Sequence, residues 1–187
     1  MKRNSTEQYF HEDSYKMIEL VSNKNYFSLT KELDNFRNIN TSEDYFVNGF
    51  KSIYKVPKTT VKLDTQKIVL SEIEEILDSL SKNKTSNIRK GYSNSYSLIE
   101  NSKGWGFEYS VIIVEYSKQY VENLWILETG EGVIIENDRG ERLKKALNSL
   151  GRKFNLVLVD WNKEMLVNIS KENYLIHYLR EKLNYNL

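Results

Sequence analysis

The sequence predicts an α+β protein in which helices pack on a mainly antiparallel sheet. Two observations support this class. Between Gly104 and Leu187, short strand patterns and helix patterns follow one another with few residues between them. In the first 80 residues, most apolar side chains recur at helical spacing. We therefore expect a mostly helical N-terminal part, followed by a block with the order strand, strand, strand, helix, strand, strand, helix.

Four helices and one short strand are expected in the N-terminal part. Ser5 to Gln8 resembles a cap before a first helix over Phe10 to Val21. A full capping box, Ser71 to Glu74, predicts the last helix, which runs to Leu80. The other elements are a helix through Leu29, Leu33 and Phe36, a helix through Phe46 to Tyr54 that Pro57 ends, and a strand over Thr59–Leu63.

Residues 81–103 are rich in Lys, Asn, Ser and Gly and show little periodicity. This composition is typical of a loop or linker. The predicted organisation is a helical part over 1–80, a polar linker over 81–103 and an α+β block over 104–187. A single domain containing all three is the alternative.

The first half of the block is expected to form three strands. Trp105 to Tyr116 alternates at the two-residue strand period. Val121–Glu128 and Gly132–Glu136 are short apolar runs, and the glycine-containing segment between them suits a tight hairpin.

The second half begins with a helix for which Asp138 is the expected cap. Its inward stripe is Leu143, Ala146, Leu147 and Leu150, and Gly151 is expected to end it. Phe154–Val159 and Met165–Ile169 are expected strands. Ser170 is expected to cap a final helix whose inward side chains are Leu175, Tyr178, Leu179 and Leu183.

Composition excludes several kinds of site. The chain of 187 residues has no cysteine, which removes disulfides, thiolate metal ligands and cysteine nucleophiles. Its two histidines, His11 and His177, lie in no metal-binding spacing, and the glycine pairs lack a dinucleotide fingerprint. We therefore expect no cofactor and no metal. With 27 basic and 26 acidic residues, and no apolar run of signal or membrane-span length, a cytoplasmic location is expected.

Four carboxylates cluster around the predicted hairpin and the helix start after it: Glu128, Glu131, Glu136 and Asp138. A solvated turn explains them most simply. They could also form an acidic surface that steers a basic partner, or a catalytic carboxylate pair or Mg²⁺ site.

Trp161 lies in the turn between the two strands that follow the predicted helix at 138–151. Either it packs on the sheet beside Val157 and Val159, or it anchors an interface from a loop tip.

Three functional hypotheses follow. The first is a non-catalytic cytoplasmic protein-binding module, such as a bacterial immunity protein or antitoxin, that covers a basic partner surface through Glu128, Glu131, Glu136, Asp138 and Trp161. The second is a hydrolase or nuclease that uses carboxylates. The third is a nucleic-acid-binding accessory protein, in which Arg89 and Lys90 contact phosphate while Tyr92 and Tyr96 stack on bases.

Overall fold

The computed structural model describes residues 7–40, 61–92, 95–107, 109–129 and 140–183. These residues form four α-helices, ten strands and three short 3₁₀ helices. The helices are α1 (Tyr26–Asn40), α3 (Leu70–Leu80), α4 (Glu141–Phe154) and α5 (Glu172–Leu183). The 3₁₀ helices are η1 (Glu12–Ser14), η2 (Asn23–Asn25) and η3 (Asp64–Gln66). The strands are β1 (Gln8–His11), β2 (Ile18–Ser22), β3 (Asn83–Thr85), β4 (Ile88–Tyr92), β5 (Ser95–Leu98), β6 (Ser102–Phe107), β7 (Ser110–Ser117), β8 (Tyr120–Glu128), β9 (Leu156–Asp160) and β10 (Met165–Val167).

The strands form two sheets. The main sheet has seven strands in the order β10-β9-β2-β8-β7-β6-β3, and every neighbouring pair in it is antiparallel. The small sheet has the order β1-β4-β5, with β1 parallel to β4 and β5 antiparallel to it. The predicted class, α+β with a large antiparallel sheet, is confirmed.

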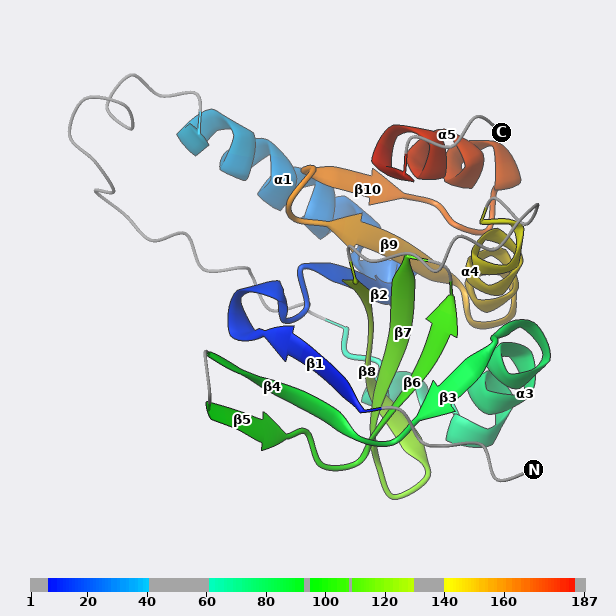
Figure 1. Cartoon of the computed structure of the whole chain (residues 1–187). Helices are drawn as coiled ribbons and strands as arrows, with labels where there is room; N and C mark the ends of the chain where they lie inside the picture. Colours follow the sequence, from blue (N-terminus) through cyan, green and yellow to red (C-terminus); the bar gives the residue numbers. More distant parts are fainter. Residues whose placement is uncertain (1–6, 41–60, 93–94, 108, 130–139, 184–187) are drawn as a thin grey trace.

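Both faces of the main sheet are covered. Helices α3, α4 and α5 lie on one side, and α1 and the small sheet lie on the other (Figure 1). The alternation of β2 shows why: Ile18 and Leu20 pack into the cluster with the three helices, while Val21 packs against α1. A sheet covered on both faces explains why β9 is buried along its whole length.

The helix expected over Phe10 to Val21 is wrong. This segment forms β1, η1 and β2, so the N-terminal region is mostly strands up to α1. Helical spacing in a short apolar segment is ambiguous, and here pairing decided it: β2 lies between β8 and β9 and hydrogen-bonds to both. Its backbone is satisfied by neighbours far away in the sequence, which local spacing does not reveal.

Two of the other expected N-terminal helices are confirmed as α1 and α3. The cap of α3 differs, because Val69 occupies the N-cap position and makes no side-chain cap bond, so Ser71 lies inside the helix. The helix expected over Phe46 to Tyr54 lies outside the described residues. The strand expected over Thr59–Leu63 is not formed in its described part, Val61 to Leu63.

Residues 81–103, expected as a polar linker, instead contain β3, β4, β5 and the start of β6. Their polarity reflects where they lie. Strands β3 and β5 are terminal in the strand order of their sheets, and β5 is largely exposed. Solvated edge strands can be as polar as loops, so composition alone does not separate the two.

The strand and helix order expected from residue 104 onward is partly matched. The single strand expected over Trp105 to Tyr116 is two strands, because the chain turns between Phe107 and Ser110, which face each other across the β6–β7 hairpin. Strands β8, β9 and β10 and helices α4 and α5 lie where the sequence placed them. The strand expected over Gly132–Glu136 lies outside the described residues.

The ends of α4 differ from expectation. Gly140 is its N-cap, and the helix continues through Gly151 to Phe154. Gly151 is needed for packing rather than for ending the helix. A β-carbon there would lie 2.6 Å from the Ile169 side chain and 2.9 Å from the backbone that joins Ile169 to Ser170.

Candidate functional site

The acidic site predicted from the sequence lies mainly outside the described residues. Glu131, Glu136 and Asp138 are not described, so their role as a partner surface stays a prediction. Glu128 is exposed at the end of β8, as that role requires.

Trp161 is in the core. Its side chain is 2% exposed and packs with Val157 and Val159, which is the packing alternative that the sequence left open. Its indole Nε1 donates a hydrogen bond to Glu19 Oε2 at 3.2 Å. As an interface anchor Trp161 remains a prediction, and its side chain would first have to be uncovered.

A surface cluster of aromatic side chains lies on the small sheet. We call Tyr9, Tyr96 and Leu98 the tyrosine cluster; His11 and Tyr92 form a second aromatic pair at the ends of β1 and β4. Tyr9, Tyr92 and Leu98 are 48%, 45% and 46% exposed. The rings of Tyr9 and Tyr96 meet edge to face with centroids 5.3 Å apart, and those of His11 and Tyr92 do so at 4.2 Å. The exposed rings therefore form contacting pairs.

The strand register explains this gathering. Phe10 and Ile88 point toward the main sheet and are buried, so Tyr9 and Arg89 point away from it, as do their neighbours Tyr96 and Leu98 on β5. Tyr92 alternates with Gly91 and follows the face of Ile88, so it meets His11 at the strand ends and not on the face of Tyr9. Arg89 is directly opposite both Tyr9 and Leu98, and Gly91 is opposite Tyr96. A β-carbon on Gly91 would overlap with the carbonyl oxygen of Ser95. Glycine at 91 therefore permits the tight approach of β5 that brings Tyr96 toward Tyr9.

Carboxylates border both the tyrosine cluster and the His11–Tyr92 pair. Tyr9 OH donates to Glu7, and Tyr92 OH donates to Asp13 Oδ1 at 2.6 Å. Each hydrogen bond, followed by burial and the carboxylate charge, raises the pKa of its tyrosine, so both hydroxyls stay protonated donors. We call Glu7, Glu12 and Asp13 the acidic rim.

The basic residues expected to contact phosphate are paired with this rim. Arg89 Nε lies 3.6 Å from Glu7 Oε1, and Lys90 Nζ lies 3.9 Å from Glu12 Oε1. The Lys90 ammonium also lies over the ring of Tyr15, 4.5 Å from its centroid. The rim side chains are 41–75% exposed and those of the two cations 32–35%, so the border presents mainly negative charge.

A buried network lies next to the small sheet, between β7, β8 and the segment that follows η1. Glu115, which sequence reasoning missed, accepts hydrogen bonds from Tyr15 OH at 2.9 Å, Trp125 Nε1 at 3.0 Å and Asn123 Nδ2 at 2.7 Å. Lys16 Nζ completes the set at 3.3 Å. The available signal was a glutamate at the end of an otherwise apolar strand, where a buried charge needs several partners. The Tyr15 ring stacks on Phe10 of β1 with centroids 6.2 Å apart, which joins this network to the small sheet.

The set around Glu115 also brings carboxylates near a lysine, which a hydrolase would require. Burial raises the pKa of Glu19, while the Trp161 hydrogen bond and the Lys16 charge oppose this shift. A raised carboxyl pKa is typical of a general acid. Here, however, both carboxylates are bound by donors that join strands and layers of the fold, so the arrangement serves packing. Among the described residues, no group of three or more histidines and acids could hold a metal ion.

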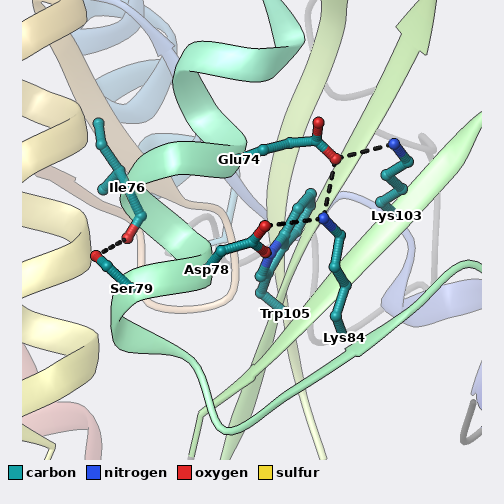
Figure 2. Close-up of polar contacts among 7 residues, drawn as sticks. All are labelled: Glu74, Ile76, Asp78, Ser79, Lys84, Lys103 and Trp105. Carbon is teal, nitrogen blue, oxygen red and sulfur yellow. Dashed lines mark hydrogen bonds and ion pairs between the residues drawn. The ribbon is translucent and has the colours of Figure 1, made fainter. Parts of the chain in front are cut away.

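A second network fastens α3 to the edge of the main sheet (Figure 2). Lys84 Nζ bridges Glu74 Oε1 at 3.0 Å and Asp78 Oδ2 at 3.2 Å, and Lys103 Nζ lies 2.9 Å from Glu74 Oε1. Trp105 Nε1 donates to Asp78 Oδ1 at 2.6 Å. Burial alone would raise the pKa of Glu74, but hydrogen bonds from Lys103 and Lys84 outweigh it and lower that pKa. This network joins α3 to β3 and β6.

Comparison with protein-family models, curated proteins and solved structures finds no match. Within the described part of the chain, none of the helices combines the length and the apolar character that crossing a bilayer requires. The surface on the small sheet is therefore interpreted from its geometry.

Proposed function

We propose that this chain is a non-catalytic protein-binding module that covers a basic surface of a partner protein with its tyrosine cluster. Immunity proteins and antitoxins act in this manner, and that class stays part of the proposal. The main observation in its favour is that exposed aromatic side chains contact one another on the small sheet and are bordered by exposed carboxylates. Tyrosine combines large apolar area with a polar tip, and aromatic side chains are enriched at protein interfaces.

Charge favours a basic protein over nucleic acid as the partner. Arg89 and Lys90 are ion-paired to Glu7 and Glu12, so phosphate would have to compete with carboxylates already in place. Phosphates would also approach the exposed acidic rim, where like charges repel. A basic protein surface would instead meet complementary charge, which speeds association.

Rigidity supports the same proposal. The tyrosine cluster lies on strands, and Phe10 and Ile88 of the small sheet are buried against Trp125 and its neighbours on the main sheet. Phe10 on β1 contacts Trp125 edge to face at 5.1 Å. Binding therefore requires little ordering of the surface, which lowers the entropic cost of association.

The test is comparative capture from extract of the organism that makes this chain. The wild type is compared with Tyr9→Ser/Tyr96→Ser and with the control Phe27→Ser/Tyr174→Ser, which removes exposed aromatics from α1 and α5. We expect a protein that binds the wild type and the control equally and binds the Tyr9/Tyr96 variant at least about tenfold more weakly, the loss of about 1.4 kcal/mol. Equal capture by all three would overturn the proposal.

A fourth variant reverses charge at Glu128, Glu131, Glu136 and Asp138. If the acidic site predicted from the sequence contributes steering, this variant associates more slowly, and the difference shrinks with added salt. If capture depends on these four residues and not on Tyr9 and Tyr96, the chain still binds a protein, but through the predicted acidic site instead of the tyrosine cluster. Thermal unfolding of each variant confirms that it is folded.

A further inference from the structure

The outer edge of the small sheet has backbone groups prepared for another strand. Ile99 N–H donates to Ile88 O at 2.8 Å, and the register pairs Lys90 with Ser97 and Tyr92 with Ser95. In an antiparallel pair, hydrogen-bonded and non-hydrogen-bonded positions alternate. The backbone groups of Ser95 and Ser97 thus point toward β4, and those of Tyr96 and Leu98 point away from it.

The parallel partner of β4 confirms this assignment. Gln8 N–H donates to Asn87 O at 2.9 Å, so odd-numbered residues of this segment point toward β1 and even-numbered ones toward β5. Among the described residues, β5 pairs with β4 alone. Strand β5 lies beside β4 (Figure 1) and is largely exposed. Two N–H donors and two C=O acceptors, from Tyr96 and Leu98, are thus directed away from β4.

This edge differs from the other terminal strands of the two sheets. Proteins protect edges with charged residues, proline, shortness or a covering element. Strand β3 has three residues and includes Lys84, β10 has three residues and contacts α1 and α5, and β1 is followed directly by the acidic residues of η1. Strand β5, Ser-Tyr-Ser-Leu, has neither charge nor proline. It is the terminal strand without such protection in the part of the chain that is described.

We infer that β5 receives an extended segment of the protein partner, which adds to the small sheet as a fourth strand. This deepens the proposed function and rests on it for the identity of the partner. Outward main-chain donors and acceptors that repeat every second residue fit the backbone of another strand. Side chains of the added segment on one face would lie beside Tyr96 and Leu98, so apolar residues are expected at alternate positions.

Continuity with the tyrosine cluster favours a different protein over a second copy of this chain. Tyr96 and Leu98 belong to both the edge and the cluster, so one partner can use the hydrogen bonds and the aromatic surface together. Two copies joined through β5 alone would bury only a four-residue strand from each. Stable interfaces bury about 1,200–2,000 Å² in total, well above what such a pair of short strands supplies.

The test uses a phage-displayed library of linear peptides, selected on the wild-type protein. Leu98→Pro removes an outward-pointing N–H and leaves the bonds of Ser97 and Ile99 to β4 in place, because proline is tolerated at such edge positions. Leu98→Val is the matched control, since it keeps the N–H and an apolar side chain. Hydrogen exchange at Ser97 and Ile99 verifies that β5 remains paired in both variants.

We expect enriched peptides with alternating apolar residues whose affinity falls at least about tenfold on Leu98→Pro and less than about threefold on Leu98→Val. Equal affinity for wild type and Leu98→Pro, or a selection that yields no peptide distinguishing them, would overturn strand addition. So would a concentration-dependent dimer that Leu98→Pro abolishes in sedimentation, because the occupant would then be a second copy.

The two proposals fail separately. If extract capture depends on Tyr9 and Tyr96 but Leu98→Pro captures the partner as well as wild type does, the proposed function stands and strand addition fails. If the selected peptides bind at β5 but capture from extract does not depend on Tyr9 and Tyr96, the edge is a binding site and the proposed function fails.

Discussion

The main sheet and the small sheet use the same chemical pair, an aromatic donor and a carboxylate, in opposite surroundings. All three tryptophans are buried, and their indole N–H groups donate to Asp78, Glu115 and Glu19. On the small sheet, Tyr9 and Tyr92 are about half exposed and donate to Glu7 and Asp13.

The difference lies in what the hydrogen bond contributes. A buried indole without an acceptor would carry a desolvation penalty, so each tryptophan–carboxylate bond stabilises the fold. An exposed hydroxyl can bond to water instead, so the tyrosine bonds contribute little to stability. They orient rings that remain open to solvent. The comparison therefore separates residues that hold the fold from residues available to a partner.

The largest expected effect is on the free energy of unfolding, which should depend strongly on the buried tryptophans and weakly on the exposed tyrosines. Trp125→Ala removes a fully buried side chain and should lower the free energy of unfolding by about 3–5 kcal/mol. Tyr96→Ala, on the small sheet, should change it by about 0.5 kcal/mol or less. Urea unfolding measures both. Trp125→Phe is the control that keeps a ring and loses only the N–H. Comparable losses for Trp125→Ala and Tyr96→Ala would show that the tyrosine cluster is part of the core.

An intermediate, pH-dependent effect is expected at the network of Trp105. The folded-state pKa of Glu74 lies below its ordinary value, so its ionised form stabilises the fold above that ordinary pKa. This stabilisation is lost as pH falls through the lower, folded-state pKa. Glu74→Gln should therefore cost up to about 1 kcal/mol at pH 7 and almost nothing once the carboxyl is protonated in both states.

Urea unfolding of wild type and Glu74→Gln from pH 7 down to pH 3 measures this difference. Glu75→Gln, one residue along α3, is the control for loss of a negative charge. A gap between wild type and Glu74→Gln that stays constant over the whole range would contradict the role of the ion pairs.

The smallest effect is expected from Tyr92→Phe, which removes an exposed hydroxyl. The free energy of unfolding should change by about 0.5 kcal/mol or less. In the unsubstituted chain, the hydrogen bond to Asp13 raises the pKa of Tyr92, so Asp13→Asn should lower it. A pH titration followed by carbon NMR of the Tyr92 ring measures this pKa. An unchanged pKa of Tyr92 in Asp13→Asn would contradict the hydrogen bond between the Tyr92 hydroxyl and Asp13.

The sequence predicted local elements well where one face is amphipathic. The stripe Leu143, Ala146, Leu147 and Leu150 is buried on α4, and the apolar run of β9 is buried as expected. It failed where pairing between distant segments decides the structure. Ile18 to Ser22 became a strand because β8 and β9 flank it, and the continuous alternating pattern from Trp105 to Tyr116 became the two strands β6 and β7.

For the candidate site as well, the sequence revealed local features but not the contacts between distant segments. Tyr92 and Tyr96 were noticed as aromatic residues in a basic segment, but Tyr9 and the acidic rim come from a segment more than 70 residues earlier. That rim reverses the electrostatic interpretation of Arg89 and Lys90, because each cation is already paired.

By itself, the sequence determined the α+β class, helices α1, α3, α4 and α5, and the absence of cysteine chemistry, because these depend on composition and on spacing within one element. The tertiary structure alone decided the place of β2 in the main sheet, the burial of Trp161 and the position of the tyrosine cluster beside β5. Each of these depends on strand pairing between segments distant in the chain, and local periodicity carries no information about which segments pair.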